Sequence, residues 1–178
     1  MWVFDLITGL PIHPLISHAV VVVVPLAAIG ALILTFVGKW RSTYSPLVLI
    51  AVLLSPITAF IATQSGEALS ERVGLPKSHA TLGERLALVV LVFAIIFSIW
   101  FAIEKSDRVR TKVPKFLQQV VKVFVPLLAI ASLVLTVLVG HSGAEATWKY
   151  RVTQAQGPAI EDPAPGTSAP ASDFAFSI

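Results

Sequence analysis

The hydrophobic positions of the chain fall into four long runs that are separated by short polar segments. Each run is rich in Val, Leu, Ile, Ala and Phe and contains no Asp, Glu, Lys, Arg or His. A helix needs about 20 mainly apolar residues to cross a hydrocarbon core of roughly 30 Å. The pattern therefore predicts four transmembrane helices, at residues 19–38, 46–63, 86–103 and 123–140.

Prolines and small residues within these runs indicate how the helices pack. Pro25 and Pro56 lie inside the first and second runs, where each removes a backbone donor, so we expect both helices to bend. Small residues permit close contact between helices. On the first and fourth runs these are Ala27, Gly30, Ser132 and Thr136. We predict an all-α membrane protein, an antiparallel four-transmembrane-helix bundle.

Local signals predict where two of the helices begin. A residue before proline is pushed out of helical geometry, so we expect His13 to precede the first helix, with Pro14 in its first turn and His18 about one turn in. The sequence "TLGE", from Thr81 to Glu84, is typical of a capping box. It predicts Thr81 as the N-cap of the third helix.

The two ends of the chain differ in composition from the middle. We divide the chain into an interfacial N-terminal segment (1–18), a four-helix transmembrane domain (19–151) and a Pro/Ala-rich acidic tail (152–178). The tail has no Lys or Arg and is of the disordered type, because it cannot bury enough apolar surface to fold alone. Apolar side chains near both ends are the expected partner-binding residues: Trp2, Phe4, Phe174, Phe176 and Ile178.

Composition narrows the classes of function. Only 13% of residues are charged, against about 25% in soluble domains. The absence of cysteine excludes thiolate zinc sites, iron–sulfur clusters and haem attached through CxxCH. No HExxH, Gly-x-Ser-x-Gly or P-loop motif is present, so we expect no enzymatic activity. The runs also lack the ionisable residues that usually mark ion or proton pathways.

The basic residues predict an orientation in the membrane. Eight of the 13 Lys and Arg lie between the first and second runs or between the third and fourth. The side with more basic residues faces the cytoplasm, so both termini are expected outside. Because the charges lie beside membrane ends, we expect no nucleic-acid partner. The eight residues are Lys39, Arg41, Lys105, Arg108, Arg110, Lys112, Lys115 and Lys122.

Candidate chemistry concentrates in four histidines, all of which fall on the predicted outer side. As metal ligands the candidates are His13, His18, His79 and His141. For haem b we favour His18 with His141, because each lies at an outer helix end. The alternative is a structural role, in which the imidazoles form hydrogen bonds to neighbouring backbone or to Glu67 and Glu145. This alternative is the leading expectation, so we expect neither a cofactor nor a metal.

Two motifs pair unusual residues at fixed separations. "GLPIHPLISHA" (9–19) and "GHSGAEATWKYRV" (140–152) resemble the Leu-Pro-x-His-Pro-x-x-x-His and Gly-His-x-Gly-Gly-x-x-Val-Tyr-Arg motifs of a bacterial membrane family, domain of unknown function 2231. The similarity covers roughly residues 9 to 152 and includes the positions of all four histidines. Ala144 replaces the second glycine, and Thr147 and Trp148 replace Val-Tyr, which weakens any inherited cofactor contact at the end of the fourth helix.

This resemblance implies a multi-pass protein of the bacterial plasma membrane in a respiratory setting, because relatives are often joined to, or found beside, haem-carrying and other respiratory redox modules. We therefore expect a non-catalytic accessory subunit that binds and stabilises a larger respiratory-chain assembly. Its partners would be respiratory-chain membrane subunits and the lipid bilayer. The alternative is a b-type haem or metal-binding electron-transfer protein that uses the outer histidines.

Overall fold

The computed structural model describes residues 6–7, 10–73 and 77–155 of the chain. These residues are almost entirely helical, apart from an antiparallel ladder that pairs Leu6 with Pro11 and Ile7 with Leu10. The elements are β1 (Leu6–Ile7), β2 (Leu10–Pro11), α1 (Ile12–Phe36), η1 (Gly38–Trp40), α2 (Arg41–Val73), α3 (Lys77–Lys105), α4 (Asp107–Lys112) and α5 (Lys115–Ala155).

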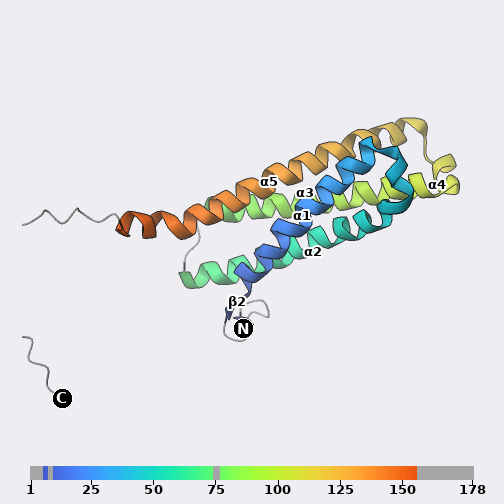
Figure 1. Ribbon diagram of the computed structural model, residues 1–178. Helices are drawn as coiled ribbons and strands as arrows, with labels where there is room; N and C mark the ends of the chain where they lie inside the picture. The colour runs from blue at the N-terminus through green and yellow to red at the C-terminus, as the bar shows by residue number, and fades with distance from the viewer. Residues whose placement is uncertain (1–5, 8–9, 74–76, 156–178) are drawn as a thin grey trace, which may run out of the picture.

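The four long helices α1, α2, α3 and α5 lie side by side as an antiparallel bundle (Figure 1). Each is long and apolar enough to cross a membrane, which confirms the predicted all-α fold with four spans. Helices α1 and α3 each pack against both α2 and α5. It follows that α1 and α3 face each other across the diagonal of the bundle. At one end of the bundle, η1 lies in the connection between α1 and α2, and α4 lies in the connection between α3 and α5.

Small residues on one helix make room for aromatic rings on another in the bundle core. Ala27 and Ala31 of α1 are completely buried in the same cluster as Phe93 and Phe97 of α3. The two phenyl rings meet edge to face with centroids 6.0 Å apart. A Cβ added at Gly30 would lie only 2.8 Å from Val48 of α2. The predicted close packing through small residues is confirmed on α1.

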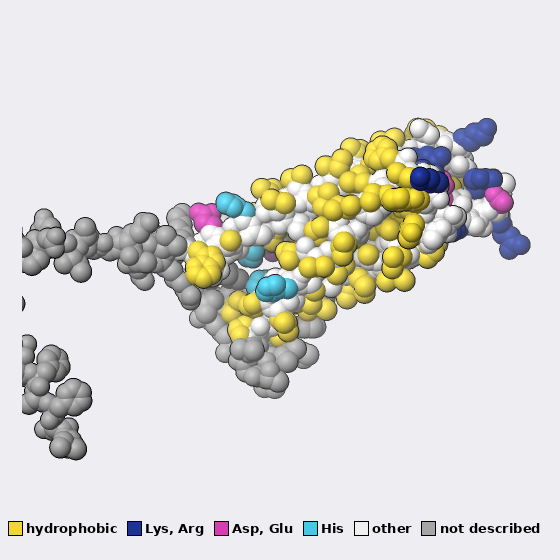
Figure 2. All heavy atoms as spheres, viewed as in Figure 1, with side chains coloured by type: hydrophobic (Ala, Val, Ile, Leu, Met, Phe, Trp, Pro, Cys, Tyr) yellow, Lys and Arg dark blue, Asp and Glu magenta, His cyan; other side chains and the backbone are white. Residues whose placement is uncertain are grey.

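Polar side chains inside the bundle are satisfied by their own helices. Ser55 donates to the Ala51 carbonyl at 2.9 Å, and Ser132 donates to the Leu128 carbonyl at 2.8 Å. Among the described residues no buried side-chain nitrogen or oxygen lacks a hydrogen-bond partner. The outside of the bundle is covered by apolar side chains (Figure 2), as a surface in contact with lipid requires.

Two predicted helix starts are wrong, because both helices begin earlier than the local signals indicate. Helix α1 begins at Ile12, so His13 lies inside its first turn. Pro14 is tolerated there because backbone N–H groups in a first turn have no intrahelical acceptor. Helix α3 begins at Lys77, and the Thr81 hydroxyl donates to the Lys77 carbonyl at 3.0 Å instead of capping the helix.

Three other sequence predictions concern the internal prolines, the segment boundaries and the partner-binding residues. Pro25 and Pro56 lie inside α1 and α2, as predicted. The boundary expected between residues 18 and 19 falls within α1, and α5 continues past residue 151 to Ala155. The five predicted partner-binding residues all lie outside the described residues: Trp2, Phe4, Phe174, Phe176 and Ile178.

The two ends of the bundle carry different polar side chains. On the face shown in Figure 2, Lys and Arg gather at the end where α4 lies, and His side chains gather at the opposite end. We call these the basic end and the histidine end. The histidine end contains the first turns of α1 and α3. The predicted excess of basic residues at the end opposite the histidines is present in the fold, and Lys77 and Arg85 lie in the first turns of α3 at the histidine end. The orientation of the two ends in a membrane stays a prediction.

Candidate functional site

The histidine end brings two of the four histidines together. His13 of α1 and His79 of α3 are both partly buried, and their ring centroids lie 6.1 Å apart with an angle of 86° between the ring planes. Because α1 and α3 are diagonal neighbours, this contact crosses the axis of the bundle. We call these two residues the histidine pair.

Helix α2 fixes the orientation of His13. Its Nδ1 lies 2.9 Å from the Ala62 carbonyl oxygen and 3.4 Å from the Ser65 hydroxyl oxygen. A carbonyl oxygen can only accept, so Nδ1 carries the hydrogen and donates it. The ring also packs on Gly66, where an added Cβ would lie 3.1 Å from both Cε1 and Nδ1. Any larger side chain at Gly66 would push the imidazole aside.

Helix α5 holds His79 in a closely similar way. Nδ1 of His79 lies 2.9 Å from the Ser142 hydroxyl oxygen, and that hydroxyl donates its single proton to the Val139 carbonyl at 3.0 Å. The Ser142 oxygen therefore accepts from Nδ1. A Cβ added at Gly143 would lie 3.1 Å from Cε1 of His79. Each helical hairpin thus places a histidine from one helix against a Ser-Gly pair on its partner.

These hydrogen bonds determine which ring nitrogen is available for chemistry. When Nδ1 carries the hydrogen of a neutral imidazole, Nε2 has a free lone pair. Histidines that bind metals are commonly oriented in this way, by a bond from the second ring nitrogen to a carbonyl or another acceptor. The histidine pair therefore presents two basic nitrogens from opposite sides of the bundle.

The pair favoured as haem ligands from sequence is not the pair that the structure brings into contact. His18 is exposed and its Nδ1 bonds to the Pro14 carbonyl of its own helix at 2.6 Å. His141 lies on an exposed face of α5. Sequence reasoning missed the pairing of His13 with His79. The two Ser-Gly pairs, at 65–66 and 142–143, are the signal that would have indicated it.

The space beside Gly143 is occupied by a side chain. A Cβ added at Gly143 would lie 3.1 Å from Cε1 of His79, so the imidazole of His79 fills the notch at this glycine. A wider groove of ≈ 470 Å³ lies between α2 and α3, and all its lining residues are apolar. Within the described residues, no group of three or more His, Asp and Glu side chains is arranged to hold a metal. In this part of the chain the histidine pair offers two imidazoles and no third side chain of these kinds beside them.

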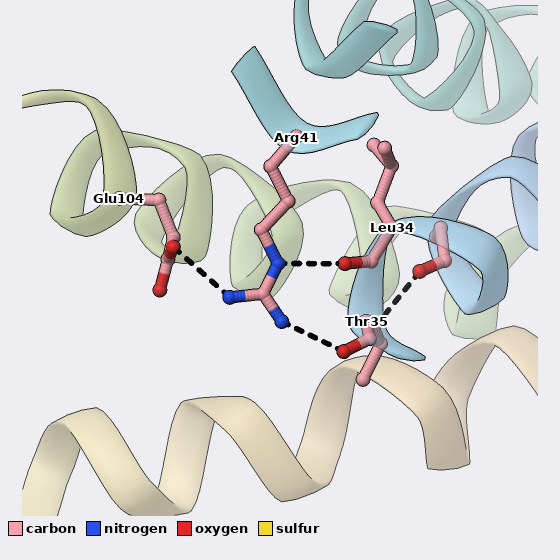
Figure 3. Close-up of polar contacts among 5 residues, drawn as sticks. Leu34, Thr35, Arg41 and Glu104 are labelled. Carbon is pink, nitrogen blue, oxygen red and sulfur yellow. Dashed lines mark hydrogen bonds and ion pairs between the residues drawn. The ribbon is translucent and has the colours of Figure 1, made fainter. Parts of the chain in front are cut away.

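A second polar cluster lies at the basic end and is built on Arg41 (Figure 3). Its Nε donates to the Leu34 carbonyl and its Nη2 to the Thr35 carbonyl, each at 2.7 Å. Nη1 lies 3.2 Å from Glu104 of α3, and the guanidinium lies over the ring of buried Trp100, 5.5 Å from its centroid. Arg41 thus closes the last turn of α1 and ties α1 and α2 to α3, a structural role that sequence reasoning did not identify.

Replacing Gly66 with leucine is expected to destabilise the protein by about 1–3 kcal/mol, the usual cost of overpacking. The reason is that the new side chain must displace the His13 ring, which already lies in contact distance. Gly140→Leu is the matched control variant, because a Cβ at Gly140 would meet nothing within 4 Å. The measurement is unfolding of both variants by denaturant in detergent micelles, and equal stability of the two would contradict the packing argument.

Comparison with known proteins gives a match at the level of the family. A family model described as "Predicted membrane protein (DUF2231)" matches residues 9–156. The matched region includes all of α1, α2, α3, α4 and α5, and with them both histidine motifs. No curated protein and no solved structure matches the chain.

Proposed function

We propose that this chain, which belongs to the family of predicted membrane proteins known as domain of unknown function 2231, is a non-catalytic accessory subunit of a larger respiratory-chain assembly. It is a multi-pass helical membrane protein. The respiratory setting is supported by the resemblance of its two histidine motifs to those of the family. Location in the bacterial plasma membrane, with both termini outside, belongs to the same proposal.

The main structural support is the closed, nearly uncharged interior of the bundle. The buried polar residues in the described part of the chain are serines and threonines: Ser45, Ser55, Ser65, Ser132 and Thr136. Pathways for ions or protons usually contain ionisable residues that face the interior of a bundle. Apart from the histidine pair at one end, the packed interior of the described helices has no such residues. This favours a protein that works through its surface, by associating with other membrane proteins.

Co-purification at native expression tests this proposal. The tagged full chain, solubilised in a mild detergent, is expected to carry respiratory-chain subunits that are identified by mass spectrometry and by their redox difference spectrum. A chain ending at Ala155 keeps the described helices and removes Phe174, Phe176 and Ile178. We expect it to lose most of the associated subunits. Migration of the full chain by itself would count against the accessory role.

A second candidate function is a b-type haem or metal-binding electron-transfer protein. The observation that favours a bound group is that His18 and His141 are both exposed at the histidine end, where a group from outside can reach them. Haem would supply one-electron chemistry, and the sequence interpretation assigns its ligation to His18 and His141. A Soret band in the spectrum of the purified protein that is lost in His18→Ala and His141→Ala would support haem, and absence of the band would exclude it.

A further inference from the structure

Both imidazoles of the histidine pair carry their hydrogen on Nδ1, so Nε2 is the nitrogen that can accept a hydrogen bond or bind a cation. His13 donates through Nδ1 to a carbonyl, and His79 donates through Nδ1 to a hydroxyl whose own proton is already used. Neutral rings in this state have one lone pair each, on Nε2. Each ring can therefore give one lone pair to a cation.

The distance between the rings matches a shared metal ion. A zinc–nitrogen bond is about 2 Å long, so two imidazoles on one ion have centroids about 5–6 Å apart, depending on the angle at the metal. The observed centroid separation is 6.1 Å. The observed separation therefore lies at the upper limit of that range.

The surroundings of the two rings favour a fixed site over a chance contact. The same Ser-Gly arrangement supports each histidine, once from α2 and once from α5. Ser65 and Ser142 limit rotation of the rings, and Gly66 and Gly143 receive their edges. Side chains that orient ligands in this way usually change metal affinity by 10- to 100-fold when they are removed.

The chemistry of the ligands selects the class of ion. Imidazole nitrogen suits zinc, copper and nickel, whereas magnesium and calcium require oxygen ligands. The described residues offer no carboxylate group that joins the histidines as a third ligand. Water or a group from outside the bundle would complete the coordination.

We propose that His13 and His79 form a two-histidine site for one late first-row divalent cation, Zn²⁺ or Cu²⁺, which links α1 to α3 at the histidine end. This site goes beyond the accessory role and does not depend on it. Binding joins two helices that are not neighbours in the bundle. We therefore expect the bound ion to stabilise the folded state.

Metal titration of the full chain without a polyhistidine tag tests the site. We expect one Zn²⁺ or Cu²⁺ per chain by calorimetry, a rise in Tm on addition of Zn²⁺, and two-nitrogen coupling in the electron paramagnetic resonance spectrum of the Cu²⁺ form. His13→Ala and His79→Ala should each weaken binding at least tenfold. His18→Ala and His141→Ala, the matched controls at the same end, should change affinity less than twofold.

A milder variant covers the case in which an alanine variant does not fold. Ser142→Ala keeps both imidazoles and removes the acceptor at Nδ1 of His79, so binding should weaken about tenfold while the helical content is unchanged. Equal losses from all four histidine variants would show adventitious surface binding only and overturn the proposal. No stoichiometric binding at micromolar metal would also overturn it. Co-purification with respiratory subunits is a separate measurement. Failure of the metal-site proposal therefore does not decide the accessory role, and failure of the accessory role does not decide the metal site.

Discussion

Replacing Arg41 with alanine is expected to lower the free energy of unfolding by about 3 kcal/mol, because two hydrogen bonds from a charged group are lost, each of which contributes about 1.5–3 kcal/mol. These bonds satisfy the Leu34 and Thr35 carbonyls at the end of α1 (Figure 3). Two such bonds would total about 3–6 kcal/mol, and their partial exposure to solvent places the loss at the lower end of that range.

The contribution of the ion pair can be separated from that of the carbonyl bonds. Glu104→Gln removes the charge partner and leaves both carbonyl bonds intact, so it should cost less than about 1 kcal/mol, as expected for a partly exposed ion pair. Arg41→Lys should be intermediate, because an ammonium group cannot reach all three acceptors in the fork geometry of a guanidinium. Denaturant titration in micelles provides the measurement. Equal losses in Arg41→Ala and Glu104→Gln would assign the effect to charge instead of to helix termination.

Replacing Phe97 with alanine is expected to cost about 3–5 kcal/mol, the usual loss when a buried phenylalanine is truncated. Phe97 is completely buried, and its ring centroid lies 6.0 Å from that of Phe93 and 5.2 Å from that of Trp100. In a membrane the loss comes mainly from packing contacts, because lipid tails are as apolar as the protein interior. The void cannot be filled by water in so apolar a cluster.

An exposed phenylalanine on another helix is the control for this prediction. Phe124 of α5 is 48% exposed, so Phe124→Ala should change stability by less than about 0.5 kcal/mol. Phe97→Leu, which keeps most of the volume, should cost clearly less than Phe97→Ala. Thermal unfolding of all three variants in the same detergent gives the comparison. A larger loss from Phe124→Ala would indicate that this face of α5 is buried in an oligomer.

Much of the fold can be predicted from the sequence because hydropathy is a property of contiguous residues. Three of the four predicted spans lie within long helices, and the first, 19–38, runs two residues past the end of α1 at Phe36. The polar segments between the spans carry the basic residues that form the basic end. Because four consecutive helices alternate in direction, the same pattern also predicts that all four histidines lie at one end of the bundle. The starts of α1 and α3 were predicted too late, because a capping box and an X-Pro step act within one turn and both helices begin before these signals.

The candidate site shows the limit of that reasoning. By itself the sequence determined that the chain forms four apolar helices with histidines at one end and basic residues at the other, because crossing a bilayer is a demand on each segment separately. The tertiary structure decided which histidines meet, by setting α1 and α3 on the diagonal and turning His13 and His79 inward while His18 and His141 face outward. It also decided that Arg41 ends α1 and joins α3. The rotation of each helix about its axis depends on how side chains of all four helices fit together, and no segment contains that information alone.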